Sequence, residues 1–182
     1  ALAGLETGAI STTEKINDTG IYTKYRDYQP RCWYYNSYHR GHGYLNVSGA
    51  IEKSCNYFFY ETGNRMGIDT LDKYANYFGL GRKTGIELPS ETAGTLASPE
   101  AAKKLNETWS AGQTLQASIG QSYNSFSPIQ LVKYIGMVAN GGNKINPTLI
   151  KRILNADGTE SSKAEINQYV KETLGLQDDN SE

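Results

Sequence analysis

The 182-residue sequence is poor in the residues that mark many specialised chains: it has two cysteines, two histidines, two methionines and five prolines. Charge of neither sign dominates, because 18 Lys and Arg residues face 19 Asp and Glu residues, and no Lys/Arg run stands out. This balance gives no indication of binding to nucleic acid or to an anionic membrane surface. No apolar stretch approaches the length of a membrane span, and no signal-peptide pattern is present.

The length allows one domain with a real core and is too short for two ordinary domains. The first residues, "ALAGLETGAI", resemble the last turns of a helix, with Leu2 and Leu5 on its apolar side and Gly8 as its stop. No capping residue or initiator methionine precedes them. We therefore expect the chain to begin inside a larger fold.

Periodicity and turn residues predict a mixed α/β chain. Residues 11–46 are rich in Tyr, Gly, Asn and Asp, which favours long loops with one or two short strands. We expect one amphipathic helix from Val47 through Phe58, and a second that is capped by Asp69 and ends at Gly79. A short strand and an irregular connection are expected over 84–100, two short strands turned at "ADG" over 148–160, and a final helix near 162–174.

The clearest local signal is a capping box at Ser127 and Gln130, with Pro128 at the first helical position. It predicts a helix that ends at "NGG", residues 140–142. The apolar residues of this helix form one stripe, which we expect to be buried: Leu131, Val132, Ile135, Val138 and Ala139.

Ser54, Cys55 and Asn56 follow one another inside the amphipathic stretch that begins at Val47. Residues i and i+2 of a helix point about 200° apart, so Ser54 and Asn56 cannot face one cleft from an unbroken helix. If the two side chains act together, the helix must break or turn at Ser54. Otherwise the helix continues, with Ser54 buried and Asn56 in solvent.

Three segments in order resemble the transpeptidase domain of class B penicillin-binding proteins. They are "GHGYLNVSGAIEKSCNYFFYETGNRMGI", "LDKYANYFGLGRKTGIELPSE" and "SIGQSYNSFSPIQLVKYIGMVANGG". Members of that family carry HG, a helix with Ser-x-Asn, a TGI-x-LP-x-E connection, IGQ, and a helix that ends in A-N-G-G. The resemblance spans roughly residues 41–142.

The resemblance implies an α/β (α+β) fold of the penicillin-binding-protein and serine β-lactamase type, mostly its helical portion, with residues 1–182 as a partial domain. In that family a serine of a Ser-x-x-Lys motif attacks a D-alanyl-D-alanine peptide or a β-lactam and forms an acyl-enzyme. By resemblance Ser54 relays a proton to the leaving amine, and Asn56 hydrogen-bonds the substrate's amide. No cofactor is implied for the catalysis.

Two of the family's three catalytic motifs are not found at their expected places. No serine of this chain is followed three positions later by lysine, so we expect the nucleophile to lie before Ala1. Lys83-Thr84-Gly85 does read as Lys-Thr-Gly, but it precedes the A-N-G-G helix, whereas the family's motif follows it. We interpret this tripeptide as a coincidence and expect the true motif beyond Glu182.

Both cysteines and both histidines fall within residues 32–55. One interpretation is a structural zinc site formed by Cys32, His42 and Cys55, with Asp27 or His39 as a fourth ligand. A second is a Cys32–Cys55 disulfide, which suits a protein outside the cytoplasmic membrane. A third is two unrelated cysteines, with Cys55 as a small buried apolar residue. The sequence leaves the three open.

The function that the resemblance implies is that of a segment of a peptidoglycan D,D-transpeptidase. Its partners are then stem peptides and β-lactams, with no nucleic acid, and the parent is anchored at the extracytoplasmic face of the cell membrane in a cell-wall synthesis complex. The alternative is a non-catalytic penicillin-binding-like module that binds peptidoglycan or a division or sporulation partner. A β-lactamase or β-lactam sensor fits less well, because the "GLGRKTGIELPSE" connection resembles class B transpeptidases.

Overall fold

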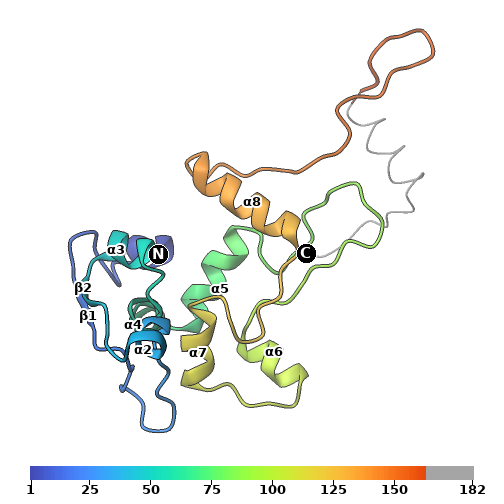
Figure 1. Ribbon diagram of the computed structural model, residues 1–182. Coiled ribbons are helices and arrows are strands. Elements are labelled where there is room, and N and C mark those ends of the chain that lie inside the picture. The colour runs from blue at the N-terminus through green and yellow to red at the C-terminus, as the bar shows by residue number, and fades with distance from the viewer. Residues whose placement is uncertain (163–182) are drawn as a thin grey trace. The chain divides into compact units, whose positions relative to one another are not determined.

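The computed structural model describes residues 1–162 and divides the chain into two compact units, each of which is described by itself (Figure 1). Unit 1 comprises Ala1–Tyr77 and Thr95–Ser125, and unit 2 comprises Phe78–Gly94 and the segment from Phe126 onward. Helices and short strands both occur, as the α/β (α+β) class requires. The helix expected near 162–174 lies outside the described residues.

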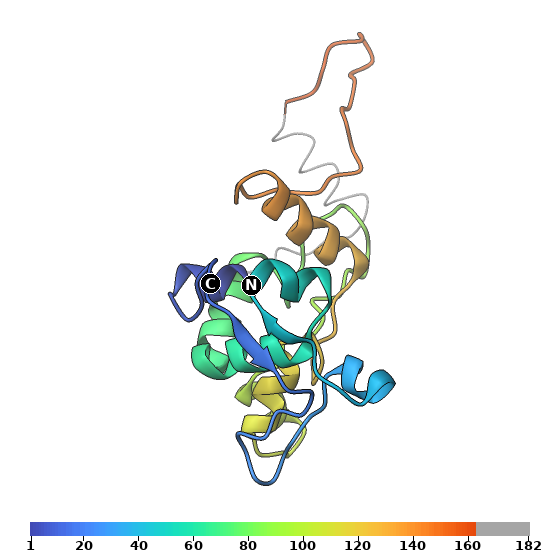
Figure 2. The same ribbon diagram turned by 60° about the vertical axis from the view of Figure 1, so that its left-hand side comes forward.

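Unit 1 contains two strands and seven of the described helices. In chain order they are α1 (Leu2–Glu6), β1 (Ile16–Asp18), α2 (Trp33–Tyr38), β2 (Gly43–Leu45), α3 (Val47–Glu52), α4 (Asn56–Met66), α5 (Ile68–Tyr77), α6 (Pro99–Lys104) and α7 (Ala111–Ala117). The two strands lie side by side as an antiparallel pair, in which Asp18 is opposite Gly43 (Figure 2). This pairing confirms the short strands expected within residues 11–46.

Helix α4 is the centre of unit 1, since it contacts α1, α3, α5, α7 and β1. Phe58 on α4 is 1% exposed and belongs to an apolar cluster with residues of both strands and of α3. Burial of a phenylalanine side chain contributes roughly 1.5–3 kcal/mol. A second cluster contains Tyr22, Tyr60 of α4 and Leu115 of α7. The core therefore holds the start of α4 firmly against β1, β2 and α3.

Three helices of unit 1 are not expected from the sequence analysis: α2, α6 and α7. The signal for α7 was present, because Ser110 and Gln113 form the same type of capping box as Ser127 and Gln130. Asp69 lies in the first turn of α5 and not at its cap. The strand expected within 84–100 is wrong, since the only pairing there is an isolated bridge between Thr95 and Ser125.

Unit 2 contains α8 (Pro128–Ala139), which begins at the predicted capping box with Ser127 as N-cap. The prediction of a buried stripe on this helix is wrong. Its five members are all exposed, and the buried residues of α8 are Gln130 and Met137. In the segment 148–160 the two expected strands are reduced to one bridge between Leu154 and Glu160 around the predicted turn.

Candidate functional site: the Ser-x-Asn turn and a buried cluster

The helix predicted from Val47 through Phe58 breaks at Ser54, as a joint role for Ser54 and Asn56 requires. The Ser54 amide donates to the Ile51 carbonyl at 3.1 Å and the Cys55 amide to the Ala50 carbonyl at 2.9 Å. These two bonds form a Schellman motif, whose left-handed position is usually glycine. Ser54 occupies that position with φ of 49° and is exposed. Helix α3 therefore ends at Glu52, with Lys53 as its C-cap and Ser54 as the next residue.

Helix α4 then begins at Asn56, with Cys55 as its N-cap residue. The Cys55 sulfur accepts a hydrogen bond from the Phe58 amide at 3.4 Å. The Asn56 side chain bonds to the Tyr60 hydroxyl one turn later, and burial raises the pKa of that hydroxyl to about 12. Asn56 is half-buried, so its amide is fixed beside the exposed Ser54 at the junction of two helices.

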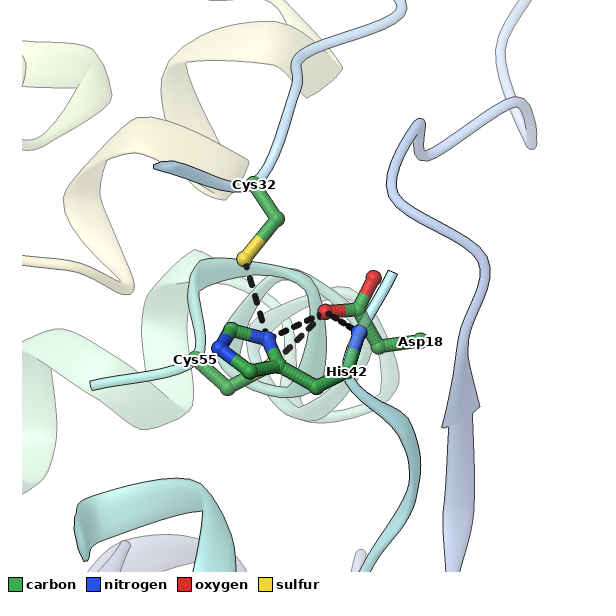
Figure 3. Close-up of side chains that lie close together, drawn as sticks. All are labelled: Asp18, Cys32, His42 and Cys55. Carbon is green, nitrogen blue, oxygen red and sulfur yellow. Dashed lines mark hydrogen bonds and ion pairs between the residues drawn. The ribbon is translucent and has the colours of Figure 1, made fainter. Parts of the chain in front are cut away.

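Cys55 points away from solvent into a cluster with Cys32, His42 and Asp18 (Figure 3). The potential ligand atoms of these four residues all lie within 4.8 Å of one another. Nδ1 of His42 lies 2.6 Å from Oδ2 of Asp18 and 3.6 Å from the Cys32 sulfur, and the Cys55 thiol donates to Asp18 Oδ2 at 3.3 Å. The cluster thus joins four segments of unit 1.

Backbone geometry brings these segments together. Asp18 ends β1, and its strand partner Gly43 follows His42 in the chain. A Cβ atom on Gly41 would lie 1.9 Å from the Asp18 carbonyl oxygen, so only glycine permits this close approach. Cys32 is the N-cap residue of α2, and its amide donates to the Gly20 carbonyl at 2.8 Å. The backbone therefore places each of the four residues of the cluster at the end of a different strand or helix.

Asp18 and Cys32 favour their negatively charged forms, whereas Cys55 favours its neutral thiol. Burial raises the pKa of the Asp18 carboxyl, but hydrogen bonds from His42, Gly20 and Cys55 outweigh it and lower the pKa below its ordinary value. A hydrogen bond from Cys55 lowers the pKa of Cys32 to about 6, and the same contact raises the pKa of Cys55. The single Cys55 proton thus faces two acceptors, which is the situation that a bound cation resolves.

The donor set fits zinc. Two sulfurs, one imidazole nitrogen and one carboxylate oxygen are ligands that Zn²⁺ takes in four-coordinate sites, and the amides of Gly20 and His42 bond to Asp18 from outside the set. Cys32, His42 and Cys55 lie together, as the sequence predicts, but neither residue predicted as a fourth ligand is with them. Asp27 and His39 are exposed and outside the cluster, and the fourth donor is Asp18.

The two thiols are free, so the structure contains no Cys32–Cys55 disulfide. The interpretation as two unrelated cysteines is also wrong, because both belong to one cluster. Asp18 was missed because it lies 14 residues before Cys32 in a segment read as loop, and only the β1–β2 register brings it to His42. The turn sequence Asp18-Thr19-Gly20, an aspartate two residues before a glycine, is the signal in the sequence that could have found it.

Lys83-Thr84-Gly85, in unit 2, forms a loop and not a strand. The Glu91 carboxylate accepts hydrogen bonds from the Thr84 amide at 2.6 Å, the Thr84 hydroxyl at 2.7 Å and the Gly85 amide at 3.0 Å. Thr84 is 7% exposed. Its hydroxyl is used in a hydrogen bond within the loop, to Glu91, which supports the interpretation of this tripeptide as a coincidence.

Among the described residues, no helix has the length and apolar character that crossing a membrane requires.

Comparisons of this chain with family models, curated proteins and solved structures agree on one protein family. The family model described as "Penicillin binding protein transpeptidase domain" matches residues 1–178. The peptidoglycan D,D-transpeptidase MrdA of Acinetobacter baumannii is 33% identical over 158 residues, which cover 83% of this chain and 22% of that protein. The chain therefore spans about a fifth of this curated relative.

Two solved structures are similar in both fold and sequence. PBP2 of Pseudomonas aeruginosa, in complex with WCK 5153, has a TM-score of 0.77 and 33% identity, over 89% of this chain and 36% of that one. PBP2 of Helicobacter pylori, in complex with MreC, has a TM-score of 0.74 and 28% identity, over 96% of this chain and 31% of that one.

Proposed function

Because the chain belongs to the transpeptidase-domain family of class B penicillin-binding proteins, we propose that it is part of a peptidoglycan D,D-transpeptidase. The parent enzyme cross-links stem peptides through an acyl-serine intermediate, and β-lactams acylate the same serine. Residues 1–182 form the middle of its catalytic domain, between a Ser-x-x-Lys motif and a Lys-Thr/Ser-Gly motif that lie outside this chain.

The observation that carries the proposal is the conformation of Ser54. Ser54 is one of five described non-glycine residues with a positive φ, a strained conformation that clusters at active sites and ligand-binding positions. The Schellman turn exposes the Ser54 hydroxyl, which can both accept and donate a proton. Asn56, at the start of α4, hydrogen-bonds the peptide backbone of the substrate through an amide that adds no charge.

We further propose that Asp18, Cys32, His42 and Cys55 hold a structural Zn²⁺. The ion takes no part in the acyl transfer. Its role is to tie β1, α2 and the approach to β2 to Cys55, which directly follows Ser54 in the chain. A bound ion at this place fixes the start of α4 and, through the backbone, the left-handed turn.

We propose a membrane-anchored parent that acts at the extracytoplasmic face within a cell-wall synthesis complex. Support comes from the Helicobacter pylori relative, which was solved as a complex between PBP2 and MreC. Stem peptides and β-lactams are the proposed partners of the catalytic site.

The function is tested with the full-length protein and labelled penicillin. We expect one covalent adduct, on a serine N-terminal to Ala1, and cross-linking of stem peptides. Ser54→Ala should lower the cross-linking rate by about 10²–10⁴-fold, the range for loss of a proton-transfer group. Ser48→Ala is the matched control, because Ser48 is exposed on α3 and outside the turn. Absence of an adduct would instead identify a non-catalytic module.

The zinc proposal is tested by metal analysis beside a count of reactive thiols. We expect about one zinc per chain in the full-length protein. Cys32→Asp should keep the metal, since a carboxylate replaces a thiolate as ligand, whereas Cys32→Ala should lose it and unfold at a lower temperature. Two reactive thiols without metal, or two thiols blocked by a disulfide, would contradict the proposal.

A further inference from the structure

A pocket of about 500 Å³ lies beside the Ser-x-Asn turn, separate from Ser54 and Asn56 themselves. Its lining residues are Trp33, Tyr34, Arg40, Gly41, His42 and Lys53, all of which belong to unit 1. Lys53 immediately precedes Ser54 in the chain, and its carbonyl accepts a hydrogen bond from the Trp33 indole at 3.1 Å. The wall of the pocket is thus bonded to the turn that presents Ser54.

The walls of the pocket are aromatic and ordered by ring contacts. Tyr34 stacks on His42 with 4.3 Å between ring centroids, and Trp33 meets both rings edge-on. The His42 side chain is 4% exposed, and its Nε2 atom has no hydrogen-bond partner among residues 1–162. Through Nδ1 the same imidazole belongs to the buried cluster, so the cluster supports one wall of the pocket.

The charged groups of the pocket are both cations, and no carboxylate is among the lining residues. Arg40 is positioned by Tyr34: its guanidinium lies 5.8 Å from the ring centroid and donates to the hydroxyl at 3.1 Å. A guanidinium fixed in this way keeps further N–H groups for a planar anion. Nζ of Lys53 lies 3.8 Å from Oε1 of Glu52. This ion pair is exposed to solvent and therefore constrains the lysine only weakly.

We propose that this pocket binds a carboxylate of the stem peptide, on the N-terminal side of the reacting D-alanyl-D-alanine bond. The inference rests on the proposed transpeptidase function. A carboxylate matches the fork of Arg40, the aromatic walls accept the adjoining alkyl chain, and Lys53 supplies a second charge one residue from Ser54. Arg40 is therefore a specificity-determining residue, and peptides that lack the carboxylate are poorer substrates.

The test compares two stem-peptide analogues in the full-length protein. One carries free carboxylates on the N-terminal side of the reacting bond; in the other they are carboxamides, and the terminal D-alanine carboxylate is unchanged in both. We expect the wild type to prefer the free acid by about 10-fold or more in kcat/KM, and Arg40→Gln to remove that preference by slowing only the free acid. Arg40→Lys should keep part of it.

Arg31→Gln is the matched control, because Arg31 also lies over a tyrosine ring, Tyr35 at 5.7 Å, but outside the pocket. It should keep the full preference. Equal kcat/KM for the two peptides in the wild type would overturn the inference, as would an equal loss for both peptides in Arg40→Gln. The proposed function is judged separately by penicillin acylation of the wild type, which a failure of the pocket proposal leaves unaffected.

Discussion

Ser54 combines a strained backbone conformation with an exposed hydroxyl group. The Schellman turn between α3 and α4 favours glycine at its left-handed position, because an L-residue there has its Cβ close to the following carbonyl. Cys55 and Ala50, whose backbone groups close the turn, are both 0% exposed, so packing holds the turn in place. The strain of Ser54 is thus maintained by the core around it.

This strain can be measured by two substitutions at the same position. Ser54→Gly should make the protein about 1 kcal/mol more stable than Ser54→Ala, since glycine adopts a positive φ without steric cost. Both variants should lose the same transpeptidase activity, because neither has a hydroxyl. Thermal unfolding of the two full-length variants checks the difference. Equal stability would show that the turn relaxes when the serine is replaced.

At the scale of the helices, α8 illustrates what periodicity cannot decide. The pattern of Leu131, Val132, Ile135 and Val138 is that of an amphipathic helix, yet the buried side of α8 is the one with Gln130 and Met137. Gln130 is 0% exposed, and its amide donates to the carbonyls of Arg82 and Ala93 at 2.5 and 2.8 Å. Within unit 2, the Gln130 side chain thus joins α8 to the backbone of the segment from Arg82 to Ala93, a contact that a hydrophobic pattern does not reveal.

The pair α5 and α6 carries a pH-dependent contribution to stability. Burial, with repulsion from Glu100 on α6 and Asp69 on α5, raises the pKa of Asp72 to about 6. The folded state therefore favours the protonated carboxyl. This contribution to stability is fully present below the ordinary pKa of about 3.9, and it is lost as pH rises through about 6. At neutral pH the ionised Asp72 is unfavourable.

We expect Asp72→Asn to stabilise the full-length protein at pH 8 and to have little effect at pH 4. A pKa difference of this size corresponds to about 3 kcal/mol for a fully buried group. Solvent screening of a carboxyl that is only partly buried reduces the expected gain to about 1 kcal/mol. Glu100→Gln should give a smaller gain with the same pH dependence. Thermal unfolding at the two pH values checks this; a gain of equal size at both would refute it.

At the scale of the whole molecule, the chain carries one of the family's three catalytic motifs at its expected place. Ser54 and Asn56 form it, whereas no Ser-x-x-Lys occurs and Lys83-Thr84-Gly85 lies in a loop of unit 2. The nucleophile is the group that a β-lactam acylates. A chain limited to these 182 residues should therefore lack β-lactam reactivity of its own.

Incubation of the purified 182-residue chain with penicillin should give no increase in mass, because the proposed role of Ser54 is to relay protons and not to act as the nucleophile. Intact-mass spectrometry measures this directly, and the full-length protein serves as the positive control. An adduct that maps to Ser54 would contradict the role assigned to that serine. An adduct on Thr84 would show that the Lys83-Thr84-Gly85 loop takes part in chemistry.

The amino-acid sequence by itself determined the family and the start of α8, and it made a break at Ser54 the condition for a joint role with Asn56. These depend on motif order and on local turn and capping bonds, which are encoded within a few residues. Tertiary structure decided that Asp18 joins Cys32, His42 and Cys55, that Gln130 is buried, and that Arg40 and Lys53 line one pocket. Those contacts depend on the β1–β2 register and on packing around α4, where residues far apart in the chain meet.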